Sequence, residues 1–204
     1  TMNYTTAVRP RTRQNTRALT MTALLSALAY MLAFLEFPVP LSPSFARMDF
    51  SDFPALIGAF AFGPLFGILV ELLKNTLQLF ATSTGGVGEF ANFLMGGAYV
   101  AVAGLIYQKH KTKRTAVIAS VVGSIAMGIT AAFANYFILL PLFEKFMPLD
   151  ELIAAFGSFL PFIHTKLDIV LFNALPFNLL KGFVISFVTM LVYKRISPIL
   201  KGNR

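Results

Sequence analysis

Cysteine is absent from this sequence of 204 residues, and histidine occurs only twice. Without cysteine, the chain forms no disulfide, offers no thiolate nucleophile and supplies no cysteine ligand to a metal. His110 and His164 lie far apart in the sequence, so we expect no metal site. The sequence also has no G-x-x-x-x-G-K-[ST] motif, which excludes ATP hydrolysis by a P-loop of its own. We therefore expect no catalytic cofactor and no catalytic activity in the isolated chain.

Charged residues are also scarce, at 13% of the chain, whereas soluble domains carry about 25%. Hydrophobic residues make up 56%, and the mean hydropathy is +0.72. The apolar residues form five nearly continuous runs, at positions 18–37, 53–80, 90–107, 115–142 and 169–193. A helix that crosses a membrane needs about 20 such residues. The composition therefore predicts an all-α, multi-pass membrane protein, with residues 1–204 as a single integral membrane domain.

Most of the positive charges fall into three clusters, and none of the nine acidic residues lies inside them. These clusters hold 12 of the 17 basic residues: Arg9, Arg11, Arg13 and Arg17; Lys109, Lys111, Lys113 and Arg114; Lys194, Arg195, Lys201 and Arg204. Lysine and arginine that flank membrane helices stay on the cytoplasmic side, where they meet anionic lipid headgroups. We therefore expect both termini, with a tail at residues 1–16, and the central connector in the cytoplasm, and no nucleic-acid partner.

The number of crossings follows from these clusters. The first and second clusters share one side of the membrane only if an even number of spans separates them, so the run at 53–80 must cross twice. Its natural break is Gly63–Pro64. The sequence thus predicts six transmembrane helices. It also places two longer loops outside: a proline-containing lid at 37–52, and a loop at 143–165 with a short interfacial helix after Pro148.

A few polar residues lie within the apolar runs, where they are costly and often functional. Glu71 and Lys74 are three residues apart, which favours either a self-neutralising pair or an acid and base for catalysis. Asn173, Asn178 and Lys181 form a polar group around Pro176, which either starts or kinks the last helix. Asn178 and Lys181 share one face of that helix, and Lys181 lies 13 residues, or about 20 Å, from Lys194. Lys181 therefore either lines a polar pocket near the outer side or forms a buried ion pair with Glu71. With Asn135, such a pocket suits a polar heterocycle, and the 22 Phe and 6 Tyr residues offer flat apolar walls.

The first helix also carries two pairs of alanines with the spacing that lets helices approach closely. They are Ala23-x-x-x-Ala27 and Ala29-x-x-x-Ala33. The spacing fits contact with a partner subunit and packing inside the six-helix bundle equally well.

Several segments together resemble one family of membrane transporters. The segments 48–64, 71–75, 84–92 and 178–182 (MDFSDFPALIGAFAFGP, ELLKN, TGGVGEFAN and NLLKG) resemble the riboflavin-specific substrate-binding subunits, or S components, of energy-coupling factor (ECF) transporters. The resemblance implies an S-component bundle in a bacterial plasma membrane that binds riboflavin tightly at its outer face. It also implies three partner chains, namely a transmembrane coupling subunit and two ATPase subunits.

The resemblance assigns roles to particular residues. The flavin would contact Asn135, Asn178 and Lys181 by its polar groups, with Lys74, Glu89 and Asn92 as further ligands and Phe45 and Met48 covering the ring. Ala23, Ala27, Ala29 and Ala33 would form the docking surface for the coupling subunit. Arg47, beside Asp49, leaves open whether riboflavin or its mononucleotide (FMN) is preferred. Two other functions remain alternatives: a gradient-driven carrier that acts alone, and an intramembrane enzyme.

Overall fold

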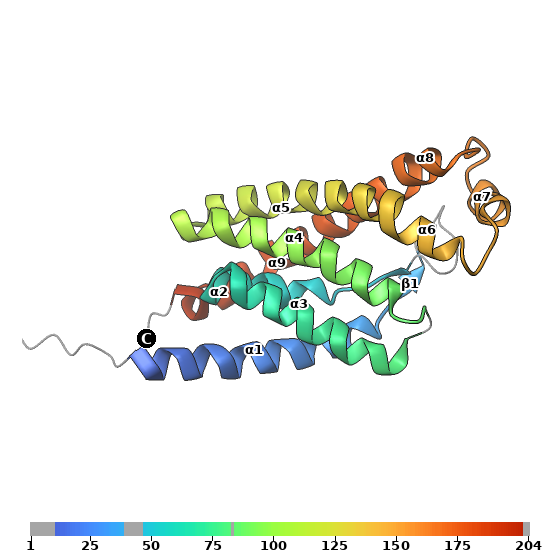
Figure 1. The fold of residues 1–204 in the computed structure, drawn as a ribbon. Helices are drawn as coiled ribbons and strands as arrows, with labels where there is room; N and C mark the ends of the chain where they lie inside the picture. Colours follow the sequence, from blue (N-terminus) through green and yellow to red (C-terminus); the bar gives the residue numbers. More distant parts are fainter. Residues whose placement is uncertain (1–10, 39–46, 83, 202–204) are drawn as a thin grey trace, which may run out of the picture.

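The computed structural model describes residues 11–38, 47–82 and 84–201, and these residues form a helical bundle (Figure 1). Its elements are α1 (Arg11–Ala33), β1 (Phe37–Pro38), β2 (Arg47–Met48), α2 (Asp52–Phe62), α3 (Pro64–Gln78), the 3-10 turn η1 (Leu79–Ala81), α4 (Val87–Lys109), α5 (Lys113–Ala134), the π-helical segment η2 (Asn135–Leu139), α6 (Leu140–Phe143), α7 (Leu149–Gly157), α8 (Lys166–Ile169), the π-helical segment η3 (Val170–Ala174) and α9 (Leu175–Lys201). The two short strands pair in antiparallel register, Phe37 with Met48. The predicted all-α class is confirmed.

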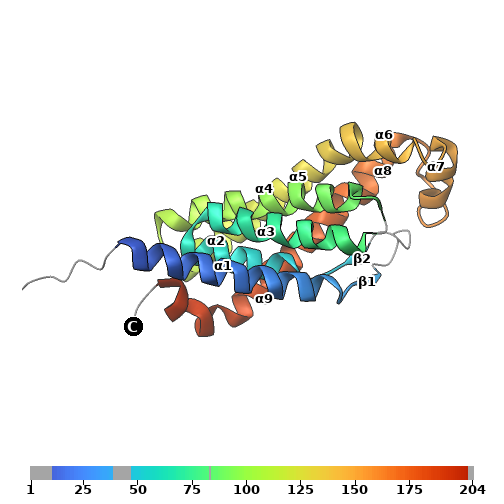
Figure 2. The ribbon, with the colours of Figure 1, turned by 60° about the horizontal axis from the view of Figure 1, so that its bottom comes forward.

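The helices run back and forth between two ends of the bundle. The beginning of α1, the turn between α4 and α5 and the end of α9 lie at one end, on the left of Figure 1. The strands, α6, α7 and α8 lie at the opposite end in both views (Figures 1 and 2). The described basic residues of the three clusters therefore belong to elements that meet at one end, as the even number of crossings requires.

The second apolar run bends back at the predicted break between α2 and α3. Gly63 has φ +114° and ψ 166°, a conformation that residues with a Cβ rarely adopt. Its N–H still bonds to the carbonyl of Ala59 at 3.0 Å. Pro64 then takes the first position of α3, where a missing N–H costs nothing. A glycine and a proline therefore suffice to turn this run into a helical hairpin.

Five helical stretches of the described chain are long and apolar enough to cross a membrane. They are Thr16–Ala33, Pro64–Ala81, Val87–Lys109, Lys113–Phe143 and Lys166–Val192. α2 is also apolar but has only 11 residues, or about 16 Å at the helical rise, roughly half of a bilayer core. The structure thus supports a multi-pass membrane protein, and the sixth crossing, by α2, stays a prediction.

The two longest helical stretches each contain one π-helical segment. η2 and η3 lie against each other. Each precedes a proline: Pro141 follows η2 and Pro176 follows η3. A proline has no N–H, and its ring clashes with the carbonyl four residues earlier, here Phe137 and Phe172. The wider π turn accommodates this clash without breaking the helix. Pro176 therefore distorts the last helix, which begins at Lys166, and does not start it.

The buried side chains form two separate hydrophobic clusters. The larger one fills the middle of the bundle and contains Phe60 and Tyr107, whose ring centroids are 4.3 Å apart. The smaller one joins α6, α7 and α8 and includes Leu152 and Phe156 of α7. The segment from α6 to α8 is thus a small cap with its own core, joined to the bundle through η2 and η3.

Candidate ligand-binding cavity and buried ion cluster

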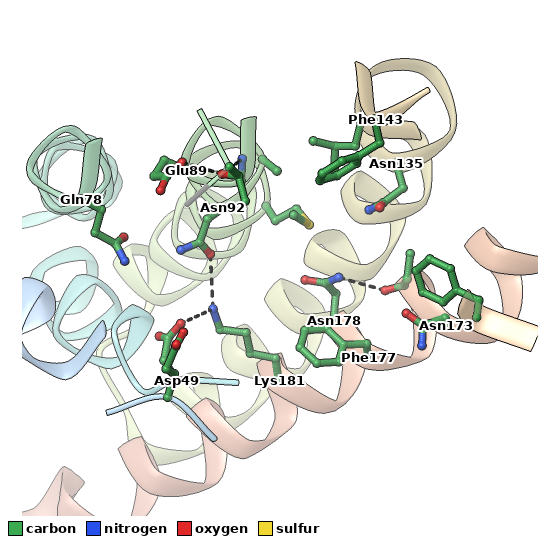
Figure 3. A pocket seen from close by; sticks show the side chains of 18 residues that line it. Asp49, Gln78, Glu89, Asn92, Asn135, Phe143, Asn173, Phe177, Asn178 and Lys181 are labelled. Carbon is green, nitrogen blue, oxygen red and sulfur yellow. Dashed lines mark hydrogen bonds and ion pairs between the residues drawn. The ribbon is translucent and has the colours of Figure 1, made fainter. Parts of the chain in front are cut away.

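A cavity of about 300 Å³ opens at the end of the bundle that carries the cap. The residues that line it come from α3, α4, α6, α7, α9, both π-helical segments and the connections around them: Glu36, Asp49, Gln78, Thr84, Gly88, Glu89, Ala91, Asn92, Met95, Asn135, Leu139, Phe143, Phe156, Asn173, Ala174, Phe177, Asn178 and Lys181. Figure 3 shows that the labelled polar side chains converge on this space from several helices.

Two asparagines are held in place by bonds to their own helices. The side-chain amide of Asn135 donates to the carbonyl of Ala131 at 2.8 Å, and that of Asn178 donates to Ala174 at 2.9 Å. A bond to the carbonyl four residues earlier restricts the side-chain rotamer. Both amides are therefore fixed at the cavity wall before a ligand arrives, which lowers the entropic cost of binding.

The apolar part of the wall consists of aromatic and aliphatic side chains. Phe143 and Phe156 come from the cap, Phe177 from α9, Met95 from α4 and Leu139 from η2. Flat aromatic faces favour stacking with a planar ligand, and the flexible thioether side chain of Met95 adapts to an irregular ligand shape. A cavity lined by amides, an ammonium and aromatic rings suits a planar heterocycle with polar edges.

A cluster of ion pairs lies beneath this cavity. The ammonium of Lys74 contacts Asp52 Oδ1 at 2.6 Å and Glu71 Oε2 at 2.7 Å, and donates to Ser51 Oγ at 2.9 Å. Asp52, Glu71 and Lys74 are all 0% exposed. Gly96 of α4 gives this cluster room, because a Cβ at that position would lie 2.6 Å from Glu71 Oε2. The predicted pairing of Glu71 with Lys74 is therefore present, as part of a larger network.

Lys181 connects this cluster to the cavity. Its Nζ lies 2.9 Å from Asp52 Oδ2, 3.4 Å from Asp49 Oδ2 and 3.3 Å from Asn92 Oδ1 (Figure 3 shows the last two contacts). The alternative of a Glu71–Lys181 pair is wrong, since these two residues have other partners. Asp49 and Asp52, at the end of the segment predicted as the outer lid, are both buried. Their charges are tolerated there because two ammonium groups from distant helices neutralise them.

The structure brings five of the eight predicted ligand residues to the cavity. Glu89, Asn92, Asn135, Asn178 and Lys181 all line it, and Glu89 accepts a hydrogen bond from Thr84 Oγ1 at 3.0 Å.

The other three predicted ligand residues lie elsewhere. Lys74 is not among the lining residues, because its ammonium is enclosed by the ion cluster. Met48 is 2% exposed and also lies outside the lining. Phe45 falls outside the described residues.

Sequence reasoning missed several residues of the cavity wall. Gln78 lies one turn after Lys74, at the polar end of α3, which was the available signal. Asn173 and Asn178 both line the cavity although they are five residues apart. In a regular α-helix the side chains of two residues five positions apart point about 140° away from each other around the helix axis. Asn173 was grouped with Asn178 and Lys181 from the sequence but was not predicted as a ligand residue, and the π turn of η3 changes the helical spacing that brings it to the cavity.

The alanines of α1 divide into two groups. Ala29 and Ala33 are 0% and 6% exposed, so this pair packs within the bundle. Ala23 and Ala27 are exposed, beside the exposed Leu24. Only the first pair of alanines thus remains on the surface for a partner.

Fold and site together define a multi-pass helical membrane protein with a small-molecule cavity at one end of its bundle. The profile of the family described as ECF transporter, substrate-specific component, matches residues 17–193. The chain therefore belongs to the substrate-specific components, or S components, of ECF transporters.

Individual relatives agree with this assignment. The chain is 36% identical to the riboflavin transporter RibU of Staphylococcus aureus, over 93% of this chain and 94% of that protein. It is 31% identical to the riboflavin transporter FmnP of Bacillus subtilis, over 92% and 96%. It also superposes with a TM-score of 0.74 on a solved S component of a bacterial ECF transporter, at 34% identity over 92% of this chain and 99% of the other.

Proposed function

We propose that this protein is the riboflavin-binding S component of an ECF transporter. The observation that carries the proposal is the cavity, which is lined by fixed amides, one ammonium and aromatic side chains. The isoalloxazine ring of a flavin has this chemistry, because it is planar and apolar on its faces and carries carbonyl and imide groups along one edge. Relatives named as riboflavin transporters, with 36% and 31% identity over most of the chain, support the same ligand.

Within the cavity, each group has a distinct task. Asn135, Asn178 and Lys181 bind the polar edge or the ribityl chain, and Glu89 and Asn92 accept hydrogen bonds from its hydroxyl groups. Phe143, Phe156 and Phe177 contact the ring. A ring carbonyl or imide left without a partner would cost about 1–3 kcal/mol, so matched partners provide selectivity. Phe45 belongs to the lid at 37–52, which covers the ring.

The protein lies in a bacterial plasma membrane with six crossings and both termini in the cytoplasm. The basic elements at one end of the bundle support this orientation, since lysine and arginine stay inside. The cavity is then at the extracellular end, where the segment 143–165 caps it and the lid at 37–52 closes it.

Release of the ligand into the cell is driven by ATP hydrolysis in partner subunits. The exposed pair Ala23 and Ala27 docks onto a transmembrane coupling subunit, since small residues permit close helix contact. Two ATPase subunits complete the assembly.

The proposal is tested by titrating the purified protein in detergent with riboflavin and with FMN, following the quenching of flavin fluorescence. We expect saturable binding of one riboflavin per chain. Asn178→Ala should weaken it at least about tenfold, whereas Gln108→Ala, at an exposed position of α4 far from the cavity, should not. Absence of flavin binding by the folded wild-type protein would refute the proposal, and tighter binding of FMN would change the ligand.

Reconstitution in vesicles without partner subunits tests the first of the two alternative functions. Uptake by the chain alone would indicate a gradient-driven carrier. An intramembrane enzyme using Glu71 and Lys74 is disfavoured, because both side chains are fully buried and neither lines the cavity.

A further inference from the structure

Lys181 is the one positively charged residue among the described residues that line the cavity. An ammonium group has three N–H donors. Three oxygen atoms surround Nζ, those of Asp52 at 2.9 Å, Asn92 at 3.3 Å and Asp49 at 3.4 Å. The direction in which Lys181 presents its charge is therefore set by these three neighbours, of which Asp52 is the nearest.

Asp52 joins two ammonium groups from different helices. Its Oδ2 contacts Lys181 of α9, and its Oδ1 contacts Lys74 of α3 at 2.6 Å. Lys74 is in turn held by Ser51 and Glu71, so Asp52 cannot shift without breaking other buried contacts. The carboxylate of Asp52 is thus a rigid anchor. It is 0% exposed and does not line the cavity itself, whereas Asp49 and Asn92 do.

We propose that Asp52 is a positioning residue, which holds the Lys181 ammonium at the cavity wall and so determines the affinity for the ligand. This inference rests on the proposed flavin-binding function. An arriving ligand oxygen replaces the longest contact of Lys181, the one to Asp49, while the contact to Asp52 keeps the ammonium in place. Asp52 therefore acts on the ligand only through Lys181.

Removing the charge of Asp52 has a specific consequence for Lys181. Its nearest remaining anion is Asp49, which lies at the cavity wall. The ammonium of Lys181 then turns toward Asp49 and pairs with it alone. A ligand oxygen therefore has to displace the Asp49 carboxylate from an ammonium that Asp52 no longer holds in place. Fixed donors bind a ligand more tightly than donors that must first reorient.

Glu71 provides a matched control. Like Asp52 it is 0% exposed and pairs with Lys74, at 2.7 Å, but the ion pairs of Lys181 are with Asp49 and Asp52 and not with Glu71. We measure the riboflavin dissociation constant and the melting temperature for Asp52→Asn and Glu71→Gln. Asp52→Asn should weaken binding at least about tenfold and Glu71→Gln by less than about threefold, with similar losses of melting temperature. Equal weakening in both variants, or none in Asp52→Asn, would overturn the proposal.

A double-mutant cycle shows whether the effect passes through Lys181. In the Lys181→Ala background, adding Asp52→Asn should change the affinity by less than about twofold, because the group that Asp52 positions is gone. A loss as large as in the wild-type background would show that Asp52 acts by another route and would reject the positioning role.

If Asp52→Asn does not fold, Asp52→Glu replaces it in both experiments. This variant keeps the charge but moves the carboxylate by one methylene, so affinity should fall at least about threefold with Lys181 present and stay unchanged with Lys181→Ala. Wild-type affinity in Asp52→Glu would count against the proposal. Failure of the proposed function is distinct, because the wild-type protein and Glu71→Gln would then bind no riboflavin either.

Discussion

Asn135 and Asn173 lie in two π-helical segments that pack against each other, and both side chains line the same cavity. The two segments also join the cap to the bundle. π turns inside helices often coincide with functional sites, because the extra residue redirects side chains. Here the two prolines that follow the segments provide the cause, and the placement of two amides at the cavity is the consequence.

The role of Pro176 in shaping the site can be tested by its removal. In Pro176→Ala the last helix can close its regular hydrogen bonds, so Asn173 rotates away from the cavity. We expect unchanged or higher thermal stability but riboflavin affinity reduced about three- to tenfold, measured by fluorescence titration. Pro198→Ala is the control, since Pro198 also lies inside α9 but far from η3. Affinity equal to the wild type in Pro176→Ala would contradict this account.

Because the space around Glu71 is tight, we expect alanine substitutions at the adjacent glycines Gly96 and Gly97 to differ in their effect on stability. In Gly96→Ala the new Cβ would lie 2.6 Å from Glu71 Oε2, so the ion cluster must shift, at a cost of about 1–3 kcal/mol. In Gly97→Ala the nearest contact is 4.0 Å, from Phe93, and the higher helix propensity of alanine should be neutral or stabilising. Melting temperatures of the purified variants should therefore fall for Gly96→Ala only. Equal values for both would mean that the cluster tolerates displacement.

Because Ala23 and Ala27 are exposed on α1, we expect a bulky substitution there to impair transport without changing ligand binding. Ala27→Leu adds bulk on the outer face of α1, which should leave riboflavin affinity within about twofold but block ATP-driven uptake in the assembled transporter. Ala29→Leu places the same side chain at a position that is 0% exposed, so it should lower thermal stability instead. Normal uptake by Ala27→Leu would reject the docking surface.

The absence of cysteine allows the orientation to be tested with single-cysteine variants. Lys111→Cys, in the turn between α4 and α5, should react with a membrane-impermeant maleimide only from the cytoplasmic side. Glu151→Cys, at an exposed position of α7, should react only from outside. Labelling of intact cells and of inverted vesicles distinguishes the two. Reaction of both variants from the same side would contradict the proposed topology.

Much of the fold followed from local rules. The apolar runs predicted the long helices, and Gly63–Pro64 predicted the hairpin between α2 and α3, because backbone conformation at these two residues depends on their own chemistry. Asn178 and Lys181 were recognised as one group since they lie on one face within one turn of a regular helix.

The remainder of the site depends on contacts between distant segments. In the sequence, Asp52 is the last residue of the loop predicted at 37–52 on the outer side, and nothing next to it indicates burial. It is buried because Lys74 and Lys181, which lie 22 and 129 residues further along the chain, reach it from two other helices. No local pattern encodes such pairings.

The sequence by itself determined that this protein is a multi-pass helical bundle and that its basic elements lie at one end of it, since hydropathy and charge distribution act residue by residue. Only the tertiary structure decided which polar residues meet. It removed Lys74 from the cavity into an ion cluster, brought Asn173 in by a π turn, and left Ala23 and Ala27 outside while it buried Ala29 and Ala33. The physical reason is that ion pairing and packing depend on distances in space, which the order of residues along the chain does not specify.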